Sequence, residues 1–527
     1  MLKSYFYNVP QIMHKVLNYF TKDWKALVVV FLFAYIIRIF YLPFGGLSFA
    51  YDQARDAFVA SNMARGDFKI LGPPVSGVPG LYHGVFYYYL ITPFYVLGNG
   101  SPLLVAYVQS FINALGIFIA YTLGRTFTKS RRAGILSAVF YAISYEATQY
   151  ANLLTNVSLA ALFVPLFYLF LYLWLVAGKF YSVFSGLFFG LMVQSEIALL
   201  YHAVPLIIFV ILRRGFIHIV SAFQFIVIFV LTTLSMILVE IKFGFKGVGG
   251  LIYLLTRSDG ISKQRDWLDI FTIYIGQLSE TVANNIFPAS FVIAGVVFAI
   301  ILIATVYKLK TTKKKNTHLA WQYFLPIAIA PQIVALPFGG GNMRHLMVGA
   351  GMLITTYFAI FTSKHLIRRT WIFATFVFLV LFTNTLYIFA NNVKGQTIFP
   401  LQRDLTISKV TQVVDYTYTA ADKGAFSVNT ITSPLWINTL WSYSYNWYGF
   451  NKYNYLPRWA GHNQVGQLGN NLAVGREAVH FLIIEPTYGI PEGFINQTLS
   501  EENSVSVVLE EKHFGDIIVQ KRAQINW

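Results

Sequence analysis

Three charged side chains near the start of the chain have the types and spacing that acid–base chemistry needs. Asp52, Arg55 and Asp56 stand three and four residues apart in the sequence YDQARDA at 51–57, a spacing that places all three on one face of a helix. Two carboxylates this close repel each other unless a cation, a proton or a substrate lies between them. We therefore expect Asp52, Arg55 and Asp56 to be catalytic; the alternative is the solvated polar face of an interfacial helix.

The catalytic candidates follow a segment that can cross a membrane. Residues 24–43 are nearly all apolar and are long enough, at about 1.5 Å per residue, to cross a hydrocarbon core of about 30 Å. Of the 527 residues in the chain, 56% are hydrophobic and 12% are charged. A soluble domain could not bury so much apolar surface, so the composition predicts a polytopic α-helical membrane protein. Carboxylates at a membrane edge are costly and are usually functional.

The charge balance and the absence of cysteine exclude several functions. A net charge of +17 would suggest a nucleic-acid partner in a soluble protein. Here the cations fall mostly in short loops between apolar segments, where they set topology and meet anionic headgroups, so we expect membrane lipids and no nucleic acid as partners. Without cysteine there are no disulfides, thiolate metal sites or cysteine nucleophiles. Residues 1–23 do not resemble a cleavable signal peptide.

Hydropathy predicts about 11 transmembrane helices. Residues 84–97 are also apolar but short and contain Pro93, so we expect an interfacial helix there. The last two segments before residue 213 are each short for a span, so residues 180–212 could form one helix or two. The predicted spans are residues 24–43, 102–124, 133–149, 156–177, 180–196, 198–212, 216–241, 282–307, 319–337, 346–362 and 370–389.

Clusters of Lys and Arg alternate with these spans and predict the orientation. They place the N-terminus in the cytoplasm and the C-terminus outside the plasma membrane. The acidic residues agree, because all but Asp23 of the 22 Asp and Glu residues fall on the outer side. The clusters are Lys3, Lys15, Lys22 and Lys25; Arg125, Lys129, Arg131 and Arg132; Lys179; Arg213 and Arg214; Lys308, Lys310, Lys313, Lys314 and Lys315; and Lys364, Arg368 and Arg369.

The chain divides near residue 394, where hydropathy falls. We expect residues 1–394 to form a membrane domain with long outer loops at 44–101 and 242–281. Residues 395–527 should form a small α/β domain outside the cytoplasm.

The pattern within this outer domain predicts a polar helix at 403–422 and strands at 478–485 and 504–510. An aromatic stretch runs from Trp436 to Trp459. Such residues suit either the stacking of sugar rings or docking onto the membrane interface.

Further ionisable groups fall near the predicted outer ends of the spans or in the outer loops. Such groups usually line a polar cavity, but each could equally cap its own helix end or belong to a solvated loop. Two of the histidines, His83 and His202, could bind a metal with a nearby carboxylate, although scattered histidines are a weak signal. No cofactor is certain, and a divalent metal stays an open alternative. The groups are His83, Glu146, Glu196, His202, Glu240, Arg257, Lys263, Arg265, Arg344 and His345.

The sequence contains no phosphate-binding loop, dinucleotide fingerprint or zinc-protease motif. Nucleotide hydrolysis by this chain is therefore excluded as an energy source. A reaction at the outer face must use an activated substrate delivered from the membrane.

Several motifs, in order along the chain, resemble the GT-C superfamily of polytopic glycosyltransferases. The likeness is to the family 39-like branch that holds the protein O-mannosyltransferases and the aminoarabinose transferase of lipid A. The mannosyltransferases carry Asp-Glu in the first loop, whereas this chain has Asp52-Gln53, which argues against transfer to protein Ser or Thr. The Asp-x-x-Arg arrangement of Asp52 and Arg55 is closer to the lipid-modifying branch. The matching residues are Tyr51, Asp52 and Arg55; Pro79, Gly80, Tyr82, His83, Gly84, Tyr87, Tyr88 and Tyr89; Gln194 and Glu196; and Arg344 and His345.

The resemblance implies transfer of a sugar from a polyprenyl-phosphate donor to an acceptor hydroxyl at the outer face, with inversion at the anomeric carbon. It implies that Asp52 takes the hydroxyl proton and that Arg55 stabilises the departing phosphate. The acceptor, whether lipid, glycan or protein, is unknown. The implied substrate-binding residues are Tyr82, His83, Tyr87, Gln194, Glu196, His202, Arg257, Lys263, Arg265, Arg344 and His345.

Two other functions stay open. A transporter or flippase of lipid-linked sugars would use the same polar groups without bond chemistry, and a non-catalytic scaffold could serve envelope assembly. Against transport, the charged residues concentrate on one face instead of continuing through the midplane, and no inverted repeat is visible.

Overall fold

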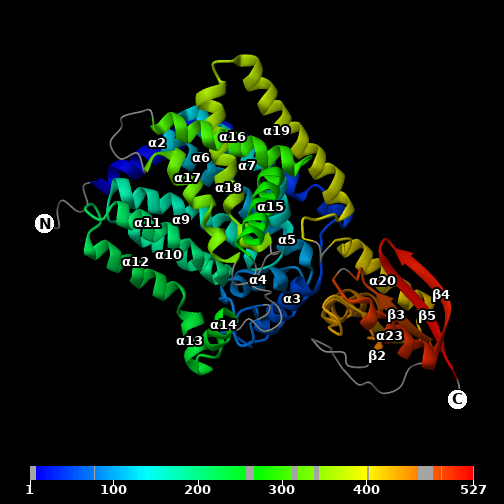
Figure 1. Cartoon of the computed structure of the whole chain (residues 1–527). Helices are drawn as coiled ribbons and strands as arrows, with labels where there is room; N and C mark the ends of the chain where they lie inside the picture. The colour runs from blue at the N-terminus through cyan, green and yellow to red at the C-terminus, as the bar shows by residue number, and fades with distance from the viewer. Residues whose placement is uncertain are drawn as a thin grey trace.

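The computed structural model of the chain describes residues 8–75, 78–256, 266–310, 319–336, 344–399, 403–460, 479–487 and 489–525. It consists of a large bundle of helices followed by a small domain built on a β-sheet (Figure 1). The sheet domain, coloured yellow to red, lies at one end of the bundle.

The bundle combines long apolar helices with short ones that carry polar residues. Its first half contains α2 (Asn8–Ile39), η1 (Leu42–Phe44), α3 (Tyr51–Ala64), α4 (Phe86–Leu97), α5 (Pro102–Ala114), α6 (Gly116–Thr128), α7 (Arg131–Ile143), α8 (Tyr145–Asn152), α9 (Val157–Ala177), α10 (Tyr181–Ser195), η2 (Ile197–His202), α11 (Ala203–Leu212), α12 (Ile219–Thr232), α13 (Leu234–Lys242) and α14 (Lys246–Thr256). Its second half contains α15 (Trp267–Ile286), α16 (Phe291–Lys310), α17 (Trp321–Ile329), η4 (Pro331–Val334), η6 (Arg344–Met347), α18 (Ala350–Phe361), the π-helical η7 (Thr362–Leu366), α19 (Thr370–Asn391) and η8 (Asn392–Lys394).

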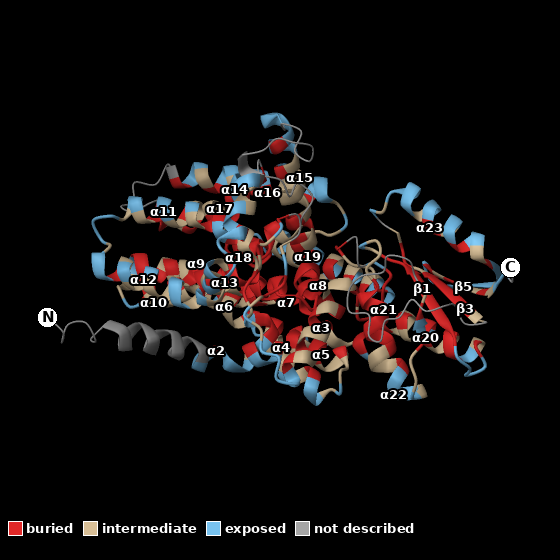
Figure 2. Cartoon of the chain, turned by 90° about the horizontal axis from the view of Figure 1, so that it is seen from below, coloured by how far each residue is buried: buried red, intermediate tan, exposed pale blue. Residues whose placement is uncertain are grey.

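The core of the bundle is formed by helices that other helices surround. All residues of α18 except Phe361 are buried, as expected for a helix that is apolar on every side. All residues of α8 are buried as well, and Figure 2 shows α7 and α8 in the red centre of the molecule. Because α8 brings Glu146, Gln149 and Asn152 into this core, these side chains need polar partners there.

Five helical segments of the described residues are long and apolar enough to cross a membrane, or six if the bent pair α12–α13 is one span. The chain is therefore a multi-pass membrane protein. The other predicted spans correspond to shorter or interrupted helices, so the total of eleven stays a prediction. The five segments are Thr21–Phe44, Pro102–Thr128, Val157–Ala177, Phe291–Leu309 and Thr370–Lys394.

Residues 180–212 form two helical segments instead of one. Glu196 has an extended backbone (φ −153°, ψ 109°) between α10 and η2. Arg213, just after α11, donates from Nη2 to the Leu175 carbonyl (3.0 Å) near the end of α9. Because α10 begins just beyond the end of α9, the end of α11 lies on the same side of the bundle as the start of α10.

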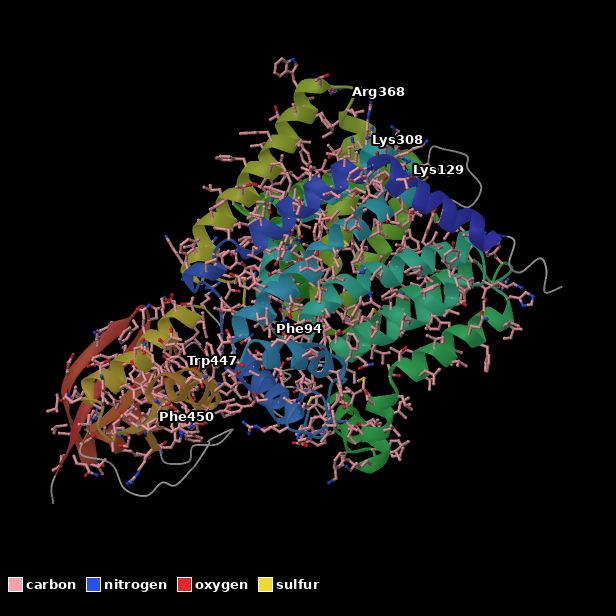
Figure 3. The ribbon with its side chains drawn as sticks, turned by 180° about the vertical axis from the view of Figure 1, so that it is seen from behind. Phe94, Lys129, Lys308, Arg368, Trp447 and Phe450 are labelled. Atoms are coloured by element: carbon pink, nitrogen blue, oxygen red, sulfur yellow. The ribbon has the colours of Figure 1, made fainter. Side chains whose placement is uncertain are left out.

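Three of the basic clusters lie at the same end of the bundle. Figure 3 labels Lys129, Lys308 and Arg368 near one another at the top, whereas Phe94 and Trp447 lie toward the opposite end, where the sheet domain is attached. This arrangement is the one that the alternation of charge predicts.

The orientation itself is a prediction that reporter fusions can check. A reporter inserted at residue 130 should indicate the cytoplasm, and one placed after residue 400 should indicate the outer side, because the basic clusters of Lys129, Lys308 and Arg368 lie at the end of the bundle opposite the sheet domain. Signals from the same compartment would contradict the orientation and an active site at the outer face.

Asp23 is expected to stabilise the end of the bundle that carries the basic clusters. Its side chain is fully buried and accepts hydrogen bonds from the Tyr121 hydroxyl (2.6 Å), from Arg125 Nη1 (3.3 Å) and from Arg131. Asp23→Asn removes the negative charge between two guanidinium groups. We expect a loss of about 3 kcal/mol in unfolding free energy, the low end for a broken buried ion pair because Arg131 is largely exposed.

The measurement is the midpoint of thermal unfolding in detergent. Asp422→Asn is the matched control, because Asp422 is exposed and its positive φ of 50° suits Asn as well as Asp. The control should change stability by less than about 0.5 kcal/mol. Equal midpoints for the two variants would contradict the stabilising role of Asp23.

The sheet domain has five strands in the order β2-β1-β3-β5-β4. The first three are parallel, with Ser427 opposite His480 at the start of the β1–β3 pairing, and β5 pairs antiparallel with both β3 and β4. The predicted polar helix and both predicted strands are present, as α20, β3 and β4. The elements are α20 (Ile407–Ala420), β1 (Ser427–Ile431), α21 (Thr439–Ser444), the π-helical η10 (Tyr445–Gly449), α22 (Phe450–Tyr453), β2 (Arg458–Trp459), β3 (Val479–Ile484), α23 (Glu492–Val505), β4 (Ser506–Phe514) and β5 (Ile517–Gln524).

Part of the aromatic stretch of this domain belongs to its core. Trp441 has no exposed surface, and only 5% of Trp459 is exposed. Trp441 Nε1 donates to the buried Glu485 Oε1 (2.9 Å). These two tryptophans therefore serve packing and offer a platform neither to a sugar nor to the membrane.

The sheet domain is attached to the bundle by backbone hydrogen bonds. The Phe49 N–H donates to the Leu405 carbonyl and the Ile407 N–H donates to the Leu47 carbonyl, each at 2.8 Å. Both bonds belong to an isolated antiparallel bridge. The segment between the first span and α3 is thus fixed by the residues that lead into α20.

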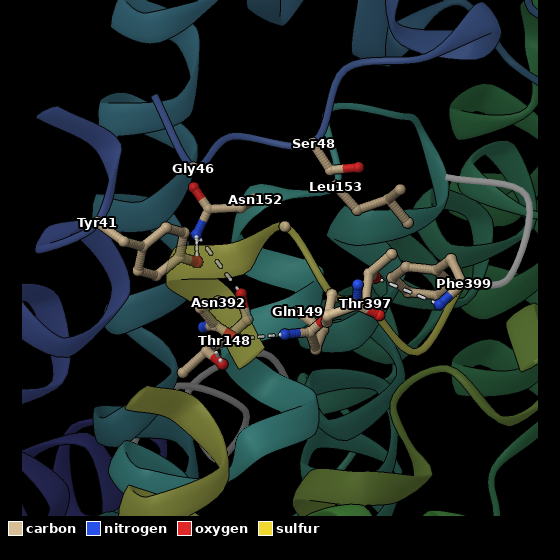
Figure 4. Close-up of a pocket in the computed structure, with 12 residues that line it drawn as sticks. Tyr41, Gly46, Ser48, Thr148, Gln149, Asn152, Leu153, Asn392, Thr397 and Phe399 are labelled. Carbon is tan, nitrogen blue, oxygen red and sulfur yellow. Dashed lines mark hydrogen bonds between the residues drawn. The ribbon is translucent and has the colours of Figure 1, made fainter. Parts of the chain in front are cut away.

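A small polar pocket lies at the same joint (Figure 4). Asn152 Nδ2 donates to the Tyr41 hydroxyl, and Gln149 Nε2 donates to Asn392 Oδ1 (2.6 Å). The pocket volume of about 30 Å³ is enough for one or two waters, since each needs roughly 10–15 Å³, but not for a sugar. Its side chains connect Tyr41, between α2 and η1, with α8 and η8.

Candidate active site

The helix that carries the catalytic candidates begins directly beyond the first span. Gly45 ends η1 in the left-handed region (φ 71°), and α3 starts at Tyr51. Gln53 is buried, and its Oε1 accepts the Ala50 N–H (2.9 Å). Gln53 therefore caps the start of α3, which gives a structural role to the position at which this chain differs from the protein mannosyltransferases.

Arg55 lies between the two carboxylates of α3. Its Nη1 donates to Asp52 Oδ1 (2.7 Å), while Nε and Nη2 both donate to Asp56 Oδ1 (2.9 and 2.7 Å). The side chains of Asp52, Arg55 and Asp56 are 45%, 15% and 1% exposed. The predicted grouping is present, but its members differ: the Asp52 side chain is partly exposed, whereas the buried Asp56 side chain holds Arg55 from inside.

Burial sets the protonation of this group. It raises the pKa of Asp56 to about 6, although the Arg55 guanidinium opposes the shift. Burial alone would lower the pKa of Arg55, but the carboxylates of Asp56 and Asp52 keep that pKa well above its usual value. Near pH 7 Asp56 is therefore ionised and paired with a permanently charged Arg55.

Asp56 should set an acid limit on activity. As the pH falls through about 6, protonation removes the charge that holds Arg55, so turnover should fall. Asp56→Asn should be slower at neutral pH and lack this acid limb. The free energy of unfolding changes with pH in the opposite direction. Because the pKa of Asp56 is raised in the folded chain, the proton is bound more tightly there than in the unfolded chain. The stabilisation from this proton is complete below the usual pKa of 3.8 and is lost as the pH rises through about 6.

The measurement is the pH profile of turnover for both proteins, recorded together with unfolding at the same pH values. An identical acid limb in Asp56→Asn would assign that limb to another group.

The loop that precedes α4 and the loop that follows α10 contact each other. The Gly84 N–H donates to the Gln194 carbonyl (2.8 Å), and the Ile197 N–H donates to His83 Nδ1 (3.3 Å). Burial lowers the pKa of His83, so its ring is neutral near pH 7, with the proton on Nε2 because Nδ1 accepts. Glu196 also caps the following helix through the Ala198 N–H (3.3 Å).

Electrostatic interactions connect these loops to α3. His83 interacts with Glu196, Arg55, His345 and Asp52. His345 in turn interacts with Glu196 and Asp52, and burial lowers its pKa. His83 and His345, which stand far apart in the sequence, therefore both lie within electrostatic reach of Asp52 and Glu196.

The neighbouring Arg344 points to a different partner. Its Nη2 donates to Glu280 Oε2 of α15 (2.9 Å), whereas the His345 ring stacks on Phe399 (5.5 Å between centroids). Arg344 also lies beside Glu146 in a small polar pocket. Arg344 and His345, which are adjacent in the sequence, therefore belong to two different groups: Arg344 to the pocket with Glu280, and His345 to the residues near Asp52.

Two of the predicted binding residues, Tyr87 and His202, bond to other side chains, although Tyr87 lies near Asp56 of α3. The Tyr87 hydroxyl is buried and donates to Gln109 Oε1 (2.9 Å), and buried His202 Nδ1 bonds the Tyr168 hydroxyl (2.6 Å); both arrangements serve packing. Tyr82 is half-buried in the loop before His83. Arg257, Lys263 and Arg265 lie outside the described residues.

Tyr88 is part of the tyrosine motif but is not among the predicted substrate-binding residues. It is buried and interacts electrostatically with both Asp56 and Arg55. The run of three tyrosines in an apolar segment predicts a helix there. It does not indicate which of the three tyrosines faces α3.

Within the described residues, no group of three or more His, Asp or Glu side chains could hold a metal ion. His202 does not join His83, since it pairs with Tyr168. The described residues therefore supply no set of ligands for the divalent metal that the sequence leaves open.

Comparison with solved structures identifies the fold. The chain is similar to ArnT from Cupriavidus metallidurans bound to undecaprenyl phosphate, with a TM-score of 0.57, 11% identity, and coverage of 94% of this chain and 97% of that one. The apo state of the same protein matches at a TM-score of 0.57 and 10% identity, covering 95% and 98%. The apo oligosaccharyltransferase of Archaeoglobus fulgidus matches at a TM-score of 0.49 and 13% identity, covering 80% and 64%.

No family model and no curated protein matches the sequence. The structural likeness extends over nearly the whole chain, including the sheet domain. The chain therefore has the fold of the ArnT structures, which agrees with the architecture that the resemblance of the sequence motifs implies.

Proposed function

We propose that the chain transfers a sugar from a polyprenyl-phosphate carrier to an acceptor hydroxyl at the outer face of the membrane, with inversion at the anomeric carbon. The observation that carries this proposal is the group of Asp52, Arg55 and Asp56 at the start of α3, directly beyond the first span. The ArnT structure of the same fold has undecaprenyl phosphate bound, which supports a lipid-linked donor.

In this reaction Asp52 accepts the proton of the acceptor hydroxyl, and the freed oxygen attacks the anomeric carbon. The bond from that carbon to the carrier phosphate breaks, and the phosphate leaves with the electron pair. A single displacement of this kind inverts the anomeric centre. Asp52 suits the base because it is the exposed carboxylate of the group and a positioned base contributes about 10²–10⁴-fold.

The other groups have roles that follow from their placement. Three of the five N–H groups of Arg55 bind the carboxylates, which fixes Asp52 and leaves donors for a phosphate oxygen. We assign the binding of sugar hydroxyls to neutral His83 and His345, together with Glu196. Arg344 and the basic residues between 257 and 265 stay proposed phosphate ligands.

The decisive experiment supplies purified protein in liposomes with polyprenyl-phosphate sugars and an acceptor lipid. Release of free polyprenyl phosphate that depends on Asp52 supports transfer. Intact carrier that redistributes between the two leaflets would indicate transport instead.

A further inference from the structure

A second, larger cleft lies where two spans meet the sheet domain. Its volume is about 610 Å³. The ends of the first span and of η8 form one wall, and α20 with the β4–β5 turn forms the other. None of its lining residues is a predicted catalytic or substrate-binding residue. Those used below are Phe44, Lys394, Asp404, Ser408, Lys409 and Gln412.

The cleft carries excess positive charge. Lys409 pairs with Asp404, and the same carboxylate accepts the Asp516 N–H (2.9 Å), so the acidic group is already satisfied by two donors. Lys394 is exposed and forms no ion pair with another described residue. The positive charge of the Lys394 ammonium is therefore available to a ligand in the cleft.

Apolar side chains lead from the membrane to this charge. Leu386 and Phe389 of α19 and Val393 of the adjoining η8 stand three and four residues apart and are 53%, 53% and 45% exposed, so they form one accessible stripe. Phe44, at the end of the first span, is 74% exposed beside the cleft. A lipid chain along this stripe would place its headgroup at Lys394.

We propose that this cleft binds the headgroup of an anionic phospholipid whose acyl chains lie along α19. The lipid phosphate would contact the Lys394 ammonium, and the Ser408 and Gln412 side chains would supply neutral donors. These two residues already adjoin each other, since Gln412 Nε2 donates to Ser408 Oγ (2.9 Å). The occupant is a structural lipid, distinct from the sugar donor.

The site is connected to α3 through the backbone. Thr406 lines the cleft and forms the isolated bridge with Ser48, four residues before Asp52. A bound headgroup therefore braces the joint that fixes the start of α3, and lipid binding should raise the unfolding temperature of the whole chain.

The test titrates detergent-solubilised protein with phosphatidylglycerol or phosphatidylcholine and counts retained lipids by native mass spectrometry. The wild-type protein should prefer phosphatidylglycerol. Lys394→Gln should weaken that lipid about fivefold, the effect of one lysine near an anionic headgroup, with little change for phosphatidylcholine. Gln412→Trp, on the exposed face of α20, should reduce retention of both lipids by filling the cleft.

Lys242→Gln is the matched control, because Lys242 is an exposed lysine at the end of another membrane helix. Equal losses in Lys242→Gln and Lys394→Gln would overturn the proposal in favour of general charge attraction. Retention of inorganic phosphate alone with the same dependence on Lys394 would also overturn it, by assigning the cleft to a soluble anion. Glycosyl transfer is not needed for either readout, so failure of the proposed function would leave this result intact.

Discussion

Asp52→Asn is expected to reduce turnover by about 10² or more while donor binding persists. The substitution preserves the size of the side chain, and its amide oxygen can still accept the hydrogen bond from Arg55 Nη1 that Asp52 accepts at 2.7 Å. The geometry of α3 is therefore retained, and the proton acceptor alone is lost. Carrier release by the two proteins at saturating donor gives the ratio directly.

The control for this experiment lies in the same segment between the first two spans, residues 44–101. Asp67 is also a partly exposed aspartate and pairs only with nearby Lys69 among the described residues, so Asp67→Asn should leave turnover close to normal. If Asp52→Asn also turned over at a near-normal rate, the general base would have to be another carboxylate, and Glu196 would be the next to test.

Arg55→Lys is expected to be damaging although it keeps the charge. The planar guanidinium of Arg55 contacts Asp52 and Asp56 through three nitrogen atoms, and an ammonium cannot reproduce that fork. Arg55→Ala should cost about 2–5 kcal/mol of transition-state stabilisation, because a buried charge pair is broken. A solvated arginine would change rates by less than about 0.5 kcal/mol, which is the expectation for the control Arg65→Ala at the exposed end of α3.

Two measurements separate the possible roles of Arg55. Loss of turnover together with loss of affinity for a non-hydrolysable polyprenyl phosphate would support contact with the leaving phosphate. Loss of turnover alone would restrict Arg55 to positioning Asp52, and equal affinities and rates would contradict both roles. Because Arg55→Ala leaves Asp56 buried without its partner, the double variant with Asp56→Asn should recover folding but not activity.

The grouping on α3 could be predicted because it depends on spacing along one helix. The difference between Asp52 and Asp56 could not, since it arises where α4 packs and covers one carboxylate but not the other. Likewise, the order of motifs pointed to His83, Glu196 and His345, but their meeting depends on loops whose paths no local pattern specifies.

The predicted span at 133–149 shows a second limit of hydropathy. The structure interrupts it at Ser144, which leaves the helix and caps α8 through the Ala147 N–H (3.0 Å). The polar side chains that follow, such as Gln149 and Asn152, are buried in protein rather than exposed to lipid. An average over a window cannot distinguish these two environments.

The bridge between Ser48 and Thr406 has a consequence for biosynthesis. The ribosome makes α3 early, yet the backbone partners of the segment before it, Leu405 and Ile407, emerge more than three hundred residues later. A nascent chain thus carries its reactive groups long before their support exists. Activity should appear only when translation is nearly finished, so that truncated products left in the membrane by stalled ribosomes would consume no donor.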